Sequence, residues 1–256
     1  MLQLLALTTL IIGCGGSGKE YLPTLKTKIM KPILILFFLS MAFCGINAQD
    51  NSFQEPDYES IKSEVEDSSS EFYYPGLLAR YTSFDTTLTQ VDYRHLYYGY
   101  LYHEDYEPYW RSKQGEELKK YYQSPQINEE DYDKVIELAT QSIGDNPFDL
   151  RPMNFLGYIY HLKGDEVMAK KVMQRLHGVI GAIFSTGDGR ECGTAFHVIS
   201  TSHEYLILNI LRFQMKSQAL TGDCDYLELA ENDRNIDGIY FNIKKLFEIN
   251  KDRMSR

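Results

Sequence analysis

The stretch that decides the fold is DYRHLYYGYLY, residues 92–102. The residues that would share one helical face are Tyr93, Leu96, Tyr97 and Tyr100. Thr89 is the expected N-cap, with Asp92 as the acid of a capping box. Aromatic residues at helical spacing are usually buried, with each hydroxyl bonded at the edge of the core. We therefore predict a packing helix here. An exposed aromatic platform for a glycan or a peptide is the alternative.

Two further helical patterns follow this stretch. Residues 131–143 form an amphipathic pattern that ends before Asn146-Pro147. Residues 153–173 follow tetratricopeptide spacing. In that pattern Gly157 and Ala169 let two antiparallel helices approach closely.

The repeat pattern is incomplete. Gly164 permits the turn inside the one full repeat. The first helix of a preceding repeat would cover residues 116–124, and Pro125 cuts it short. About three repeats are needed for a self-supporting solenoid, so these helices must pack on the rest of the chain.

Beyond residue 185 the pattern becomes β-like. The predicted strands are residues 194–200, 205–213, 226–230 and 239–243. Residues 205–213 are apolar on both faces, which fits a central strand and also fits a helix. A closing helix is predicted at residues 244–250. The predicted fold class is α+β, with a tetratricopeptide-like helical part packed on a small, mostly antiparallel β-sheet.

The first 48 residues carry targeting signals. Residues 30–48 fit a signal peptide that is cleaved after Ala48, because Lys31 precedes an apolar run too short to span a membrane. We expect residues 1–29 to be an upstream extension that begins at a mis-called start. The alternative is a lipoprotein, since the run before Cys14 resembles a lipoprotein box. Only that alternative places the protein on a membrane.

The expected organisation has five parts. They are the extension (1–29), the signal peptide (30–48), a polar flexible leader (49–71), a helical part (72–184) and a β-rich part with the closing helix (185–256). Within the leader, residues 58–65 fit a short helix. The last two parts should form one compact unit. The expected location is the periplasm, the cell envelope or the medium.

Charge and motifs exclude several classes of function. Acidic residues outnumber basic ones 36 to 26, and no Lys/Arg run could follow a phosphate backbone, so we expect no nucleic acid partner. Residues 13–19 have the glycine and lysine spacing of a phosphate-binding loop. Glu20, however, stands where such a loop needs a hydroxyl, so we expect no nucleotide and no other cofactor.

No catalytic residue can be assigned, since neither His-Glu-x-x-His nor Gly-x-Ser-x-Gly occurs. The set Cys192, His197, His203 and Cys224 could surround a zinc ion in principle. Its spacing matches no zinc class, so we predict no metal site. In an exported chain Cys192 and Cys224 can form a disulfide, and two reduced thiols are the alternative.

Several stretches together resemble an uncharacterised family, the domain of unknown function 4919, found in secreted proteins of gut-type Bacteroidetes. They are residues 86–100, the helix pair around 146–147, residues 195–199 with 203–205, and Cys224-Asp225 before 239–243. The resemblance spans roughly residues 58–248. It implies an exported or cell-envelope protein. It implies no reaction, substrate or catalytic residue.

The function that fits these observations is a non-enzymatic module whose helix pairs hold a protein or peptide partner. The alternative is an enzyme or a glycan-binding module with a site between the tyrosine-rich helix and the sheet. The candidate binding residues of that site are Arg94, His95, Tyr98, His197 and His203.

Overall fold

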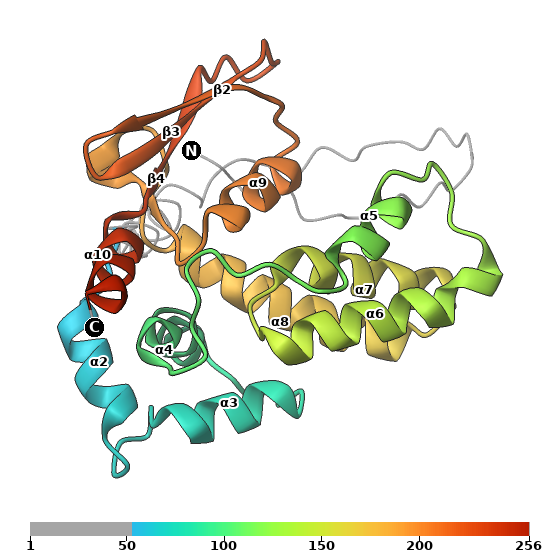
Figure 1. The fold of residues 1–256 in the computed structure, drawn as a ribbon, viewed down its shortest axis with the longest axis horizontal. Coiled ribbons are helices and arrows are strands. Elements are labelled where there is room, and N and C mark those ends of the chain that lie inside the picture. Colours follow the sequence, from blue (N-terminus) through green and yellow to red (C-terminus); the bar gives the residue numbers. More distant parts are fainter. Residues whose placement is uncertain (1–52, 256) are drawn as a thin grey trace, which may run out of the picture. The chain divides into compact units, whose positions relative to one another are not determined.

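A computed structural model describes residues 53–255 of the chain. The predicted extension and signal peptide, the lipoprotein box at Cys14 and the loop at 13–19 lie outside the described residues. The described part holds nine α-helices and a four-stranded sheet (Figure 1), so the α+β prediction is confirmed. The helices are α2 (Tyr58–Glu66), α3 (Tyr74–Thr82), α4 (Gln90–Gly99), α5 (Gly115–Tyr122), α6 (Tyr132–Asp145), α7 (Leu150–Leu162), α8 (Glu166–Phe184), α9 (Thr201–Ile210) and α10 (Lys244–Met254).

Helix α4, seen end-on in Figure 1, packs against α2, α3 and α8. Its capping box is confirmed, since the Thr89 hydroxyl accepts from the Asp92 N–H at 3.2 Å and the Asp92 carboxylate accepts from the Thr89 N–H at 2.7 Å. The four residues of its predicted face are all buried in the core. The packing prediction is therefore confirmed, and the alternative of an exposed platform is wrong.

Helix α2 lies inside the segment that we expected to be a flexible leader. It matches the short helix predicted at residues 58–65, and Asp57 caps it by accepting from the Ser60 N–H at 3.0 Å. Ile61 and Val65 are buried in the main core. This segment is polar overall, but these two apolar residues are four positions apart and share the helical face that packs against α4.

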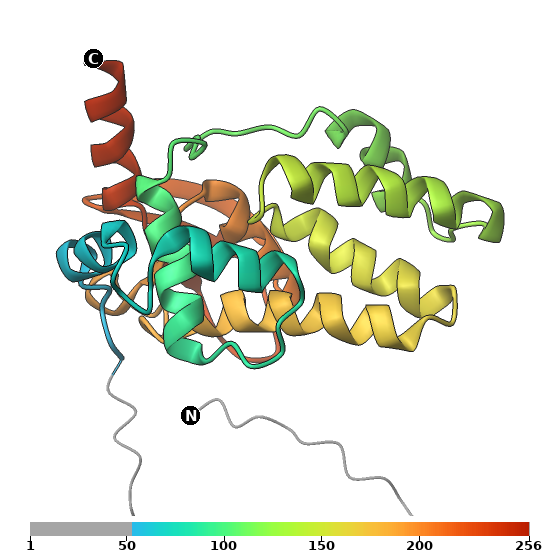
Figure 2. The ribbon, with the colours of Figure 1, turned by 90° about the horizontal axis from the view of Figure 1, so that it is seen from below.

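Helices α5 to α8 lie side by side in chain order (Figure 2), and each packs against the next. The close approach predicted at Gly157 is confirmed, because a Cβ there would lie 2.6 Å from the Met173 sulfur. Gly164 has φ +80° in the predicted turn. Helix α5 ends at Tyr122, shortly before Pro125. A second, smaller apolar cluster fills the space between α5, α6 and α7. It consists of Leu118, Ile127, Val135, Leu138 and Ile159.

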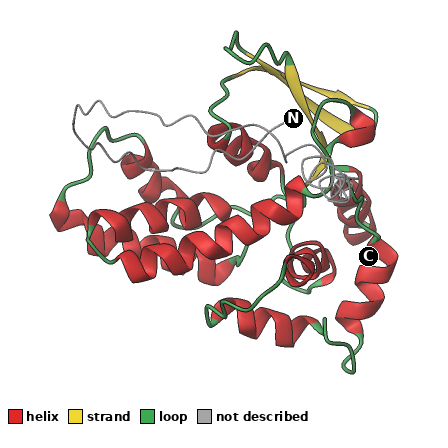
Figure 3. Ribbon diagram, turned by 180° about the vertical axis from the view of Figure 1, so that it is seen from behind, coloured by secondary structure: helices red, strands yellow, loops and turns green. Residues whose placement is uncertain are grey.

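The sheet (Figure 3) has the strand order β1-β4-β3-β2. The strands are β1 (Phe196–His197), β2 (Met215–Thr221), β3 (Cys224–Leu229) and β4 (Gly238–Asn242). Only the short β1–β4 pair is parallel. Alternate residues of β3 and β4, among them Leu227 and Phe241, join the same core as α4 and α8. The strands predicted at 226–230 and 239–243 are confirmed, whereas that at 194–200 shrinks to two residues.

The strand predicted at residues 205–213 is wrong, because residues 201–210 form helix α9. Its buried residues include Leu206, Ile207 and Leu208, which follow one another directly. Such a run fits a helix that is buried around most of its circumference as well as a central strand. The N-cap Ser200, whose side chain accepts from the Ser202 N–H, marks the helix start.

The close packing of α4 on α8 can be tested at Gly178. A Cβ there would lie 2.2 to 2.4 Å from ring atoms of Tyr93. That ring is buried and held edge-on against Tyr81, so it cannot move away freely. We expect Gly178→Ala to lower the free energy of unfolding by about 1–3 kcal/mol in denaturant titrations.

Gly144→Ala is the matched control. Apart from the helix's own backbone and the two chain neighbours, no atom of the described residues lies within 4 Å of a Cβ at this helical position in α6. Alanine should therefore raise the free energy of unfolding by about 0.5–1 kcal/mol through helix propensity. Equal stability of the Gly178→Ala variant and the parent would contradict the packing described for α4 and α8.

Candidate binding pocket beside His197

Two of the five predicted site residues are structural. His203 is fully buried in α9, where Nδ1 bonds the Tyr97 hydroxyl at 2.7 Å and Nε2 bonds the Phe148 carbonyl at 2.9 Å. Burial lowers the pKa of His203 to about 4. His95 stacks on a phenylalanine ring, and its two ring nitrogens bond the Val91 carbonyl and the Glu64 carboxylate. Neither imidazole is available to a ligand.

The other three predicted residues lie together. The Tyr98 hydroxyl donates to the His197 carbonyl at 3.1 Å. The Arg94 guanidinium lies 5.8 Å from the centre of the Tyr98 ring and donates to the Ser185 hydroxyl and to the Gln54 carbonyl. Helix α4 thus holds the end of β1 on one side and the chain before α2 on the other.

His197 borders a pocket of about 310 Å³. The remaining lining residues are Glu55, Pro56, Asp57, Tyr58, Glu59, Asn242, Lys244, Lys245 and Glu248. They come from the start of α2, the end of β4 and the start of α10. Sequence reasoning missed the pocket because it assigned residues 55–59 to a flexible leader.

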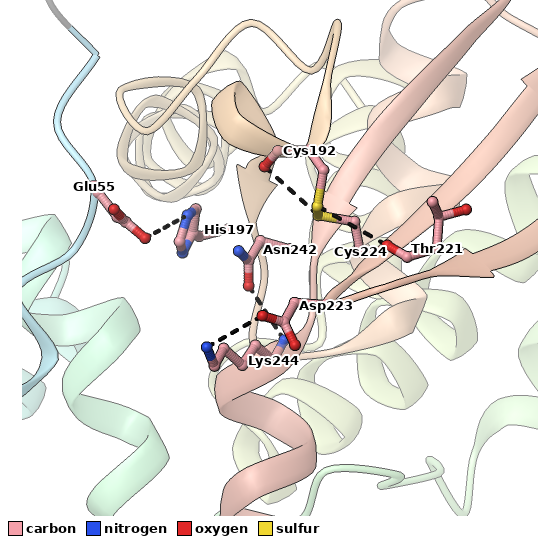
Figure 4. The surroundings of a disulfide bond; sticks show 8 residues. All are labelled: Glu55, Cys192, His197, Thr221, Asp223, Cys224, Asn242 and Lys244. Carbon is pink, nitrogen blue, oxygen red and sulfur yellow. Dashed lines mark hydrogen bonds and ion pairs between the residues drawn. A yellow bond between two sulfur atoms is a disulfide. The ribbon is translucent and has the colours of Figure 1, made fainter.

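The imidazole of His197 is held from one side. The Tyr58 hydroxyl lies 3.1 Å from Nδ1, and Nε2 lies 3.7 Å from the Glu55 carboxylate, beyond hydrogen-bond distance. Burial, and then the charge of Arg94, lower the pKa of His197 to about 4. His197 is therefore neutral at pH 7. Figure 4 shows Glu55 pointing toward the imidazole, with Asn242 and Lys244 nearby.

A disulfide joins Cys192 to Cys224 close to this pocket (Figure 4). It links the 3₁₀ turn before β1 to the first residue of β3 across 32 positions of sequence. Both thiols of the zinc set considered above are used in this bond. Within residues 53–255 no group of three or more His, Cys, Asp or Glu side chains is placed to hold a metal ion.

Residues 59–252 match the family model described as Domain of unknown function (DUF4919). The chain belongs to this family. The match covers more than half of the chain and confirms the resemblance noted in the sequence. No curated protein and no solved structure matches the chain. The description of this family names no reaction, substrate or ligand.

One surface of the DUF4919 chain is an aromatic row across α5 and α7, here called the α5–α7 face. It consists of the exposed residues Tyr158 and Leu162 and of Phe155 and Tyr122, which are partly buried against the smaller apolar cluster. The ring centres of Tyr122 and Phe155 are 4.9 Å apart, and those of Phe155 and Tyr158 are 6.3 Å apart. Arg151 lies 4.2 Å above the Tyr122 ring.

Among the helices of the described residues, none combines the length and the apolar character that a membrane span requires.

Glu204 is a buried carboxyl that sequence reasoning did not single out. It is fully buried in α9, and within the described part neither of its carboxyl oxygens has a hydrogen-bond partner. Burial, and then the charge of Asp225, raise the pKa of Glu204 to about 9. At pH 7 this side chain is a neutral acid inside the core.

The disulfide should contribute to stability mainly by restricting the unfolded chain. We expect the Cys192→Ser, Cys224→Ser double variant to lose about 2–4 kcal/mol of unfolding free energy. Denaturant titration measures the loss, and reductant should destabilise the parent while leaving the variant unchanged. Alkylation of both cysteines in unreduced, folded protein would contradict the bond.

Glu204 should make stability fall at alkaline pH. The folded protein keeps a proton up to about pH 9, whereas the unfolded chain releases it near pH 4.5, so stability is lost as pH rises between these values. Between pH 6.5 and 8.5 the loss should be on the order of 2 kcal/mol. The lowered pKa values of His197 and His203 change stability mainly below pH 6.5, outside this window.

Glu204→Gln keeps the shape of the side chain and removes its titration. Its unfolding free energy should therefore stay nearly constant over the same pH range. A parent protein whose stability does not change from pH 6.5 to 8.5, measured by denaturant titration, would show that the acid is not held neutral in the core.

Proposed function

We propose that this DUF4919 chain is an exported, non-enzymatic module that binds a protein or peptide segment on the α5–α7 face. The observation that carries the proposal is the exposure of Tyr158 and Leu162 beside two partly buried rings, Phe155 and Tyr122. The Tyr158 side chain is 50% exposed and Leu162 is 36% exposed, although both belong to a helix whose other side is buried. Exposed aromatic and aliphatic side chains in one row are typical of interaction surfaces.

Arg151 indicates which segment would fit. Within the described residues it forms no ion pair, and its guanidinium rests on the Tyr122 ring, which pre-orders it. A peptide with an apolar side chain for the row and a carboxylate for Arg151 would complement both features. Arginine and tyrosine are also the residue types that most often dominate binding energy at interfaces.

The helix arrangement supports a tetratricopeptide-like role. Helices α7 and α8 form one antiparallel pair with the small residue Gly157 at the contact, and α5 and α6 form a shorter pair before it. In repeats of this kind, stacked helix pairs create the binding surface. Here the first helix of each pair, α5 and α7, carries the α5–α7 face.

Export is supported by two independent features. The Cys192–Cys224 disulfide suits an oxidising compartment such as the periplasm, the cell envelope or the medium. The sequence of residues 30–48 fits a cleaved signal peptide. An origin in Bacteroidetes stays a prediction from the sequence resemblance.

The second candidate function is the recognition of a small ligand between the tyrosine-rich helix and the sheet. It is favoured by the pocket beside His197, where titratable side chains from α2, β1 and α10 converge. An enzymatic or glycan-binding role would use this same place.

The peptide proposal is tested by replacing the two exposed residues of the α5–α7 face. Peptides selected from a displayed random library against the full chain should pair an aromatic or aliphatic residue with Asp or Glu. Their affinity, measured by titration calorimetry, should fall at least about tenfold in a Tyr158→Ser, Leu162→Ser double variant, because two exposed anchors are lost. Arg151→Gln should remove the preference for the acidic residue.

Val91→Ser is the matched control, since Val91 is a half-exposed apolar residue on another helix. It should leave affinity unchanged. Peptides that bind the double variant as tightly as the parent, or that lose as much affinity in the Val91 variant, would refute the assignment of this face.

A further inference from the structure

The pocket beside His197 contains a carboxylate without a cationic partner. Lys244 pairs with Asp223 at 3.1 Å, and Lys245 pairs with Glu59 at 3.7 Å and Glu248 at 3.4 Å. Both lysines of the pocket are therefore already paired. Glu55 lies 3.7 Å from the neutral imidazole of His197 and forms no ion pair with a lysine or arginine among the described residues, although Lys244 is close enough to interact with its charge; the Glu55 side chain is 78% exposed.

A second polar atom beside Glu55 also lacks a partner. The His197 side chain is only 6% exposed, and the Tyr58 hydroxyl fixes its Nδ1. Its Nε2 borders the pocket without a hydrogen bond. When Nδ1 carries the proton and donates it to the Tyr58 oxygen, Nε2 is a hydrogen-bond acceptor. It then lies 3.7 Å from a second acceptor, the Glu55 carboxylate.

The charge balance of the pocket selects the sign of a ligand. Four carboxylates line it, from Glu55, Asp57, Glu59 and Glu248, against the two lysines. Arg94 is a third cation near His197; it bonds only neutral carbonyl and hydroxyl groups and keeps its charge, so the four carboxylates still outnumber the three cations. An anionic ligand would face an excess of like charge, whereas a cation would meet an unpaired carboxylate.

We propose that this pocket binds a basic group, an ammonium or a guanidinium, with the Glu55 carboxylate and the His197 Nε2 as its acceptors. The donors of such a group can reach both atoms at once. A volume of about 310 Å³ accommodates a single amino-acid-sized ligand. The site uses α2, β1, β4 and α10, none of which contributes to the α5–α7 face, so it goes beyond the peptide surface and stands without it.

The test compares ligands that differ only in charge. N-acetyl-arginine amide is titrated into the full chain beside N-acetyl-citrulline amide, in which a neutral urea replaces the guanidinium. N-acetyl-lysine amide and N-acetyl-norleucine amide form a second pair. We expect each cationic probe to bind at least about tenfold more tightly than its neutral match, and N-acetyl-glutamate amide to bind more weakly than either cation.

Two variants locate the site. Glu55→Gln should bring the affinity of the cationic probes down to that of the neutral ones, and the exposure of Glu55 means that the fold tolerates this change. Glu71→Gln alters an exposed carboxylate outside the pocket and should have no effect. Free arginine and a peptide with an internal arginine then distinguish a small-molecule ligand from a basic residue of a partner chain.

Several results would overturn the proposal. Equal binding of the charged and neutral probes would mean that charge is not recognised. Equal losses in the Glu55 and Glu71 variants would place the effect in the overall charge of the protein. Absence of binding by every cationic probe at millimolar concentration, or tighter binding of the glutamate probe, would exclude a cation site.

Discussion

The structure depends on tyrosine hydroxyls that bond the backbone at the last residue of β1 and just after it. Tyr98 donates to the His197 carbonyl at 3.1 Å, and Tyr106 donates to the Ile199 carbonyl at 2.7 Å. The Ile199 N–H in turn donates to the Tyr97 oxygen at 3.2 Å. The Ile199 groups lie beyond the last residue of β1, and an unpaired buried backbone group costs roughly 1–3 kcal/mol. The aromatic residues of this region therefore fill the core and also replace a missing strand partner.

This bonding also prepares the candidate pocket. The backbone of His197 is fixed by Tyr98, and its imidazole is fixed by Tyr58, so the side chain is held before any ligand arrives. The Cys192–Cys224 bond anchors the turn before β1 to β3 nearby. A site whose groups are already ordered loses less conformational entropy on binding. The hydrogen bonds of the tyrosine-rich core thus also hold a residue of the pocket at its edge in place.

The parts of the fold that could be predicted are those with a local signal. Helix α4 shows its periodicity and its cap within a dozen residues, and the Gly157 contact follows from spacing alone. Strand β2 was missed because all seven of its residues are exposed, so burial imposes no alternation on its sequence. Helix α9 was mistaken for a strand because three consecutive buried residues satisfy both patterns. The pocket combines residues near 55, 197 and 245, a juxtaposition that no local pattern encodes.

The same comparison explains why a histidine is a weak sign of function in this protein. A tyrosine-rich core contains many hydroxyl donors, and imidazole nitrogens are suitable acceptors for them, as the bond between Tyr97 and His203 shows. Both ring nitrogens of His203 and of His95 are bonded within the described structure. His197 is also bonded to a tyrosine, Tyr58, but in the arrangement proposed above its Nδ1 is the donor, and its Nε2 borders the pocket without a hydrogen-bond partner among the described residues. The feature that separates the candidate binding histidine from the packing ones here is the second ring nitrogen, and only the tertiary structure determines what that nitrogen faces.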